Sequence, residues 1–320
     1  MELGVYTAAF RLWPLERTLD RIADLGVSAV EIATGNFGGD NHCKPHHLLE
    51  DPVSLEKFRL LFDQRGLKIA ALNCSGNPLH PKPEIAEWHR QTLRMTIVLA
   101  ERLGVPCVVT MSGCPGDGPG ARIPNWVVYP WPQEFLEVLR WQWDEVASPF
   151  WRDMERFARE RGVRLALEMH PGMLVYNPET LLQLRALTGP NLGANLDPSH
   201  LWWQGIDPGQ AIRQLGDVIF HVHAKDCVLD PWRIAENGVL DLHPYSSIAE
   251  RRWNFRTVGY GHGEQEWRRL VSTLRMTGYD GVLCIEHEDA LADPEEGLQR
   301  AVTFLRNCIL ERPPGALTWV

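Results

Sequence analysis

The chain has 320 residues, of which 44% are hydrophobic and 23% are charged, and its formal net charge is −9. This is the composition of an ordinary globular protein with ample core material. The acidic balance argues against nucleic acid or an anionic membrane as the main partner. No apolar run approaches the roughly 20 residues of a membrane span, and the first residues read as a strand rather than a signal peptide. With seven cysteines and no CxxC pair, we expect buried thiols in a reducing, cytoplasmic compartment.

Short β-rich runs alternate with amphipathic helical patterns along the whole chain. Near-continuous apolar strands covered by helices indicate a parallel sheet, and eight such units predict an α/β fold of the (β/α)8 TIM-barrel type. No repeat or linker interrupts the pattern, so we expect a single domain over 1–320. Helical patterns follow the strands, for example over 84–104 and 295–311. The expected strands are residues 2–6, 29–33, 68–74, 107–112, 164–170, 192–197, 218–225 and 281–287.

Two connections are much longer than the others, and both follow the carboxyl end of a strand. The first, 113–132, comes after strand 4 and is rich in Gly and Pro, and the second, 227–263, comes after strand 7. Loops of this length in a compact domain are usually functional. We expect the second to be an insertion that serves a larger substrate or a small partner subunit.

Polar residues of metal-binding type end four consecutive strands of the predicted barrel. They are Glu168 after strand 5, Asp197 after strand 6, His223 after strand 7 and Glu286 after strand 8. In a TIM barrel the chemistry is carried by the carboxyl ends of the strands. Buried carboxylates need a partner or a metal, and three oxygen ligands with one nitrogen suit Mn²⁺, Mg²⁺, Co²⁺ or Fe²⁺, and Zn²⁺ less obviously.

Further candidates for substrate contact lie on the same rim. Because side chains alternate along a strand, His170 shares a face with Glu168; Asn73 ends strand 3, and His200 follows strand 6. Lys225 is placed to stabilise a developing enolate, with a simple pair to the adjacent Asp226 as the alternative.

Three other features of the sequence can be explained without a role in the site. Arg256 belongs to a basic loop that is either a binding site for a substrate anion or a solvated patch. His221 is expected to be a buried, hydrogen-bonded histidine. The segment "GYGHGE" at 259–264 is similar to a phosphate-binding turn before a helix, although one Gly-rich turn is weak evidence. No P-loop, GxGxxG or GxSxG motif supports ATP, NAD or serine-hydrolase chemistry.

The motifs "LEMHP", "NLDPSH", "HVHAKD" and "IEHED", in this order on strands 5 to 8, resemble those of the xylose-isomerase-like sugar phosphate isomerase/epimerase family. That family includes ketose 3-epimerases, inosose dehydratases and hydroxypyruvate isomerases. The resemblance implies that Glu168, Asp197, His223 and Glu286 bind one divalent metal ion, with Mn²⁺ expected first. It also implies that the two glutamates are the acid/base pair on opposite faces of a sugar, and that His200 contacts substrate.

The chain departs from the ketose 3-epimerases in two places that bear on the reaction. Leu229 stands where an arginine follows the aspartate in those enzymes, and 227–263 is longer. We expect a metal-dependent isomerase or epimerase of a sugar or keto-sugar. The alternatives are a dehydratase or 3-oxo-glycoside lyase, including a C-glycoside-cleaving subunit; a non-catalytic sugar-binding barrel; and a DNA-repair endonuclease of the endonuclease IV type, which the acidic charge disfavours. A homo-oligomer is also compatible with the sequence.

Overall fold

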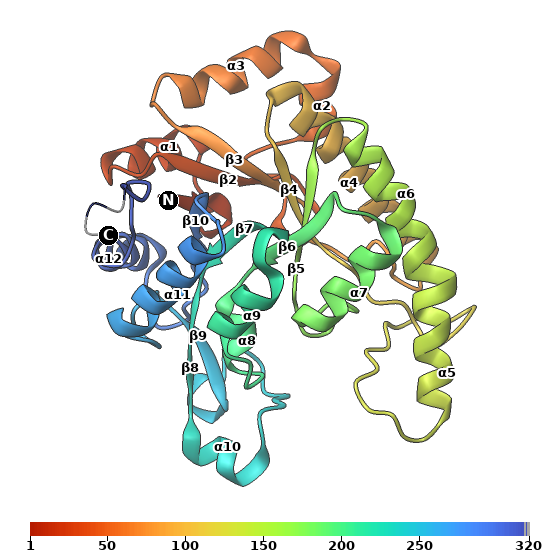
Figure 1. The fold of residues 1–320 in the computed structure, drawn as a ribbon. Helices are drawn as coiled ribbons and strands as arrows, with labels where there is room; N and C mark the ends of the chain where they lie inside the picture. The colour runs from red at the N-terminus through yellow and green to blue at the C-terminus, as the bar shows by residue number, and fades with distance from the viewer. Residues whose placement is uncertain (317, 319–320) are drawn as a thin grey trace.

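Eight parallel strands close into a barrel in the computed structural model, which describes residues 1–316 and 318 (Figure 1). The strand order around the barrel is β1-β10-β7-β6-β5-β4-β3-β2, so the chain winds once around the barrel and β10 closes it against β1. The predicted (β/α)8 barrel is therefore confirmed. The strands are β1 (Glu2–Tyr6), β2 (Ala29–Ala33), β3 (Lys68–Asn73), β4 (Cys107–Met111), β5 (Arg164–Glu168), β6 (Leu192–Leu196), β7 (Ile219–Ala224) and β10 (Val282–Ile285).

Helices surround the barrel and bury their apolar faces against it (Figure 1). The α-helices are α1 (Leu15–Asp24), α2 (Pro45–Glu50), α3 (Pro52–Asp63), α4 (Pro83–Leu103), α5 (Glu134–Trp141), α6 (Ser148–Arg159), α7 (Pro178–Thr188), α8 (Pro198–Trp202), α9 (Pro208–Leu215), α10 (Pro231–Asn237), α11 (Glu264–Met276) and α12 (Pro294–Arg306). Shorter turns are η1 (Thr7–Phe10), η2 (Asn36–Gly38), η4 (Gly216–Val218) and η5 (Ile248–Glu250), and a π-helical stretch, η3 (Gln142–Ala147), joins α5 to α6. The helix predicted over 295–311 ends earlier, at Arg306.

The turns that lead from helix to strand use glycine in the left-handed region. Gly26, Gly66, Gly104, Gly162 and Gly278 have φ of 66°, 62°, 70°, 67° and 88°. Only glycine adopts these angles without a steric penalty from Cβ. Each of these glycines lies shortly after the end of a helix and before the next strand.

The main core lies between the strands and the surrounding helices, where Trp151 of α6 and Trp267 of α11 are among the largest fully buried side chains. All seven cysteines lie in the described part of the chain and are buried and free, as the sequence predicted. Among the described residues, no helix is both long and apolar enough to cross a membrane.

The segment after β7 is more ordered than the loop that the sequence predicted. It forms an antiparallel hairpin of β8 (Asp226–Leu229) and β9 (Trp253–Arg256), with α10 at its far end, and extends away from the barrel (Figure 1). Trp203 and Trp253 of β9 stack with ring centroids 4.6 Å apart. The sequence missed these strands because each has only four residues, too short for a period-2 pattern to be distinctive.

Candidate metal centre and cavity

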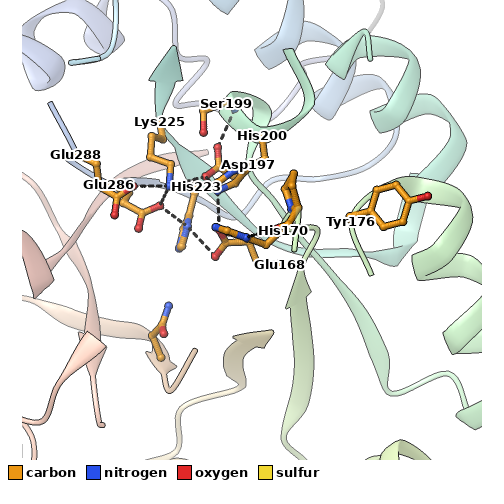
Figure 2. Close-up of polar contacts among 12 residues, drawn as sticks. Glu168, His170, Tyr176, Asp197, Ser199, His200, His223, Lys225, Glu286 and Glu288 are labelled. Atoms are coloured by element: carbon orange, nitrogen blue, oxygen red, sulfur yellow. Dashed lines mark hydrogen bonds and ion pairs between the residues drawn. The ribbon is translucent and has the colours of Figure 1, made fainter. Parts of the chain in front are cut away.

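Glu168, Asp197, His223 and Glu286 come together at the carboxyl end of the barrel. Each offers one ligand atom, and these atoms all lie within 4.8 Å of one another (Figure 2). The four side chains lie together because of the strand order. Strands β5, β6, β7 and β10 are neighbours in the barrel, and their carboxyl ends share one rim. Glu168, Asp197 and His223 are 3%, 1% and 0% exposed, and the side chain of Glu286 is 13% exposed. Three carboxylates therefore meet where little water separates their charges.

The four side chains fit a divalent cation. Asp197 Oδ2, His223 Nδ1 and Glu286 Oε2 are buried, and within 1–316 and at 318 they form close ion pairs but no hydrogen bond of acceptable geometry. Buried polar atoms are nearly always bonded to a partner, to water or to an ion. A divalent cation would satisfy all three atoms at once and offset the repulsion between the carboxylates.

Lys225 supplies a positive charge beside this cluster. Its ammonium lies 3.1 Å from Asp197, 2.9 Å from Glu286 and 3.1 Å from Glu288 (Figure 2). Burial alone would lower the pKa of Lys225, but Asp197 and Glu286 outweigh it and raise that pKa well above its usual value. The alternative in which Lys225 pairs with Asp226 is wrong, because Asp226 bonds elsewhere.

Glu286 stays ionised in this setting. Burial by itself would raise the pKa of Glu286, but Lys225 and His223 hold that pKa well below its usual value. Burial likewise opposes the charged form of His223, yet Glu31 and Glu286 raise the pKa of His223 well above 6.5. Before a cation binds, His223 is therefore a charged partner of the carboxylates.

His200 and His170 contact the cluster from one side. His200 Nε2 lies 3.1 Å from Glu168 Oε1 and 3.4 Å from Asp197 Oδ2, and the two histidine rings have centroids 4.2 Å apart (Figure 2). His170 Nδ1 is 2.6 Å from the carbonyl oxygen of Pro171. Burial lowers the pKa of each histidine to about 4, so both rings are neutral near pH 7.

Glu31 is a member of the polar network that the sequence analysis missed. It is 0% exposed and accepts hydrogen bonds from Asn73 Nδ2 at 2.7 Å, His221 Nε2 at 2.7 Å and His223 Nε2 at 2.9 Å. Burial would raise the pKa of Glu31, but His223 and His221 outweigh it and lower that pKa far below its usual value. Its signal in the sequence was a charged residue in the middle of the apolar strand at 29–33. The prediction that His221 is a buried, hydrogen-bonded histidine is confirmed.

A cavity of about 190 Å³ opens onto the cluster. Asn73, His170 and Lys225, three of the predicted substrate contacts, line it together with Glu168 and Glu286. Tyr6, Ala8, Ala9, Arg11, Phe37, Gly38, Ser75, Met111, His287 and Glu288 complete the wall. The cavity therefore combines aromatic and polar surface with direct access to two carboxylates.

The structure does not bring Arg256 to this cavity. Arg256 lies on β9, where its Nε is 3.1 Å from Asp289 Oδ2. The same Asp289 oxygen accepts a hydrogen bond from the Thr257 amide at 2.8 Å. Arg256 thus ties the hairpin to the segment after β10, and we leave it out of the site.

The Gly-rich turn at 259–264 does not offer its amides to a phosphate. The amides of Gly259, Gly261 and His262 donate to Asp226 Oδ2 at 2.9, 3.1 and 3.0 Å, and His262 Nδ1 lies 2.8 Å from Asp226 Oδ1. A carboxylate of the protein itself already occupies this anion-binding turn. The similarity of this turn to a phosphate-binding turn, weak evidence in the sequence, therefore does not indicate a phosphate site.

Similarity to known proteins agrees with the fold and bears on the reaction class. The chain is 39% identical to the uncharacterized protein YfiH of Bacillus subtilis (strain 168) over 312 residues, 97% of this chain and 99% of that one. It is 26% identical to the inosose dehydratase of Clostridium tetani (strain Massachusetts / E88) over 168 residues, which is 52% of this chain and 54% of that one.

A solved structure with the same fold is that of the 3-keto-D-glucoside 4-epimerase YcjR from E. coli in its apo form. The TM-score is 0.65 at 16% identity, over 96% of this chain and 100% of that chain. The model of the xylose isomerase-like TIM barrel family matches residues 19–308. The chain therefore belongs to the xylose isomerase-like TIM barrel family.

Proposed function

We propose that the protein is a divalent-metal-dependent isomerase or epimerase of a sugar or keto-sugar. The observation that carries this proposal is the cluster of Glu168, Asp197, His223 and Glu286, whose ligand atoms lie within 4.8 Å of one another and two of whose carboxylates line the cavity. Mn²⁺ is the first choice of ion for three oxygens and one nitrogen, with Mg²⁺, Co²⁺, Fe²⁺ and Zn²⁺ as alternatives.

In the proposed reaction one carboxylate removes a proton from a carbon of the substrate, and a second carboxyl group supplies a proton to a carbon. The cation, when bound, acts as a Lewis acid that stabilises the negative charge formed when a C–H bond beside a carbonyl breaks. Glu286 is ionised and therefore suited to take the proton. Glu168, held by His200 at 3.1 Å, gives a proton to the opposite face of the same carbon in an epimerase, or to the neighbouring carbon in an isomerase. Proton exchange of both carboxyl groups with water then restores their starting states. Lys225, a fixed cation at the same wall, stabilises the enolate.

The first test joins metal analysis with proton exchange. We would measure the metal content of the purified protein and of Asp197→Ala, then incubate both with ketoses and 3-keto-glucosides in D₂O and follow C–H exchange by NMR. We expect near one metal ion per chain, lost in the variant, and deuterium entering one carbon. The absence of metal from wild-type protein under metal-replete conditions would overturn the proposal, and one metal ion without exchange would favour a sugar-binding barrel.

A dehydratase or 3-oxo-glycoside lyase is the second candidate, and Glu288 favours it. Its side chain lies on the cavity wall and is half exposed, at 51%. Lys225 favours its ionised form, but burial and the charge of Glu286 prevail and raise the pKa of Glu288. A raised pKa makes the Glu288 carboxyl easier to protonate, and β-elimination requires a proton donor for the leaving oxygen. Glu288→Gln would then abolish an unsaturated product while C–H exchange persists.

A partner for the insertion at 227–263 remains a prediction. Trp232, Leu240 and Leu242 on this segment are 81%, 63% and 98% exposed. We propose that this surface meets a small partner subunit or a second copy of the chain. Size-exclusion chromatography with light scattering separates these outcomes from a monomer.

A further inference from the structure

We propose that Glu31 is a positioning residue of the metal centre, which fixes the His223 ring so that Nδ1 faces the cation. The inference rests on the proposed metal-dependent function. Glu31 does not contact the cavity, and it belongs to β2, which is not a neighbour of β7 in the barrel. It therefore acts through His223 and not on a substrate.

The geometry assigns different partners to the two nitrogens of His223. Nε2 lies 3.1 Å from Glu31 Oε1 and 2.9 Å from Glu31 Oε2. Nδ1 lies on the other side of the ring, 3.0 Å from Glu286 Oε2 and 3.8 Å from Glu168 Oε2. A carboxylate can only accept, so Nε2 must carry a proton. Nδ1 also faces a carboxylate in the metal-free site, where His223 is charged, so a cation that binds there displaces the Nδ1 proton while Glu31 keeps the proton on Nε2. This is the carboxylate–histidine–metal arrangement by which a neighbour sets the tautomer of a ligand.

Glu31 is itself held rigidly, which a positioning residue requires. Asn73 Nδ2 binds its Oε1 at 2.7 Å and His221 Nε2 binds its Oε2 at 2.7 Å. The ring of Tyr6 stacks on His223 at 17° between planes, with centroids 5.8 Å apart. Neither a rotation of the imidazole nor a swing of the carboxylate is possible without breaking several of these contacts.

Stability alone does not account for a carboxylate at this position. Replacing a buried ion pair by apolar side chains of similar volume is often neutral or stabilising. The β2 residues that share the face of Glu31 are apolar, since Ala29 and Ala33 are both buried there. A charged residue there is explained by its effect on His223, which supplies the one nitrogen ligand of the cluster.

The test compares Mn²⁺ binding by wild type, Glu31→Gln and Glu155→Gln with isothermal titration calorimetry. Glu155 on α6 is a matched control. It is a buried carboxylate, 2% exposed, and it accepts a hydrogen bond from the Asn191 amide away from the site. We expect Glu31→Gln to weaken Mn²⁺ binding by 10 to 100-fold, the usual effect of losing such a partner, and Glu155→Gln to bind as wild type. Thermal melts of the metal-free proteins show whether each variant is folded.

A spectroscopic measurement reports on His223 directly. In the Zn²⁺-loaded wild type, ¹⁵N NMR should show His223 with a protonated Nε2 in a strong hydrogen bond and a metal-bound Nδ1, and Glu31→Gln should shift the Nε2 proton upfield. If Glu31→Gln does not fold, Glu31→Asp is the second variant. It keeps the charge but shortens the side chain, so the carboxylate no longer reaches His223, and we expect the same loss of Mn²⁺ affinity.

The outcomes separate the two proposals. Wild-type Mn²⁺ affinity in a folded Glu31 variant, or a protonated Nδ1 in the loaded wild type, would overturn the inference and leave the proposed function standing. A wild-type protein that binds no divalent cation would overturn both.

Discussion

The ammonium of Lys225 lies 2.9 Å from Glu286 Oε2 inside the carboxylate cluster. The pair does more than neutralise one glutamate, because the same ammonium is 3.1 Å from Asp197 and 3.1 Å from Glu288. Lys225 is therefore the internal counter-ion of a site whose carboxylates would otherwise repel one another until a cation arrives.

Removing this counter-ion should make the fold depend on metal. We expect Lys225→Met to lower the stability of the metal-free protein by about 3–5 kcal/mol, the usual cost of leaving a buried charge unpaired. Added Mn²⁺ should raise the melting temperature of the variant more than that of wild type, because the cation replaces the lost charge. Calorimetric melts with and without Mn²⁺ measure this, and Lys57→Met, at an exposed position, is the control. An equal Mn²⁺ response in wild type and Lys225→Met would contradict it.

The two glutamates on the cavity wall should carry the proton transfer. We expect Glu168→Gln and Glu286→Gln each to slow C–H exchange by roughly 10² to 10⁴-fold, the typical contribution of a general acid or base. The amide keeps the shape and an oxygen ligand, so the assays are run at saturating Mn²⁺ with metal content measured in parallel. The control Glu155→Gln should exchange at the wild-type rate. Full activity in a metal-loaded Glu168 or Glu286 variant would remove the acid/base assignment.

Because His200 is buried and neutral, the free energy of unfolding should decrease as the pH falls below about 6.5. Its folded-state pKa of about 4 lies below its usual value of 6.5, so between these pH values the unfolded chain binds a proton that the folded chain does not. Stability therefore rises with pH across this window and is lost as pH falls from about 6.5 to 4, by up to about 3 kcal/mol.

Urea unfolding of the metal-free protein at several pH values tests this window. His200→Gln should flatten the slope, whereas His46→Gln, at a histidine whose side chain is 72% exposed, should leave it unchanged. A wild-type slope in His200→Gln would mean that other groups set the acid sensitivity.

Asp226 should hold the base of the insertion in place. Its carboxylate accepts hydrogen bonds from three backbone amides of the turn at 259–262. We expect Asp226→Asn to cost about 3 kcal/mol, since the amide replaces a charged acceptor, and to speed proteolytic cleavage within 227–263. Asp230→Asn is the control, because asparagine serves equally well as the N-cap of α10. Cleavage of the two variants at the same rate would show that Asp226 does not anchor the segment.

The sequence by itself determined the barrel and the four-residue cluster. Strands that are apolar throughout and alternate with helices leave few topologies open, and a parallel barrel brings every carboxyl strand end to one rim. Glu168, Asp197, His223 and Glu286 could therefore be placed together from their positions at strand ends alone.

Only the tertiary structure decided which side chains serve the cluster. Glu31 and His223 are 192 residues apart in sequence and meet across the barrel interior, a contact that no local pattern encodes. Lys225 turns away from its neighbour Asp226, and Asp226 accepts the amide hydrogen bonds of the Gly-rich turn at 259–264. Buried polar groups pair with whatever the closed fold brings within hydrogen-bond reach, so these partners follow from packing rather than from spacing along the chain.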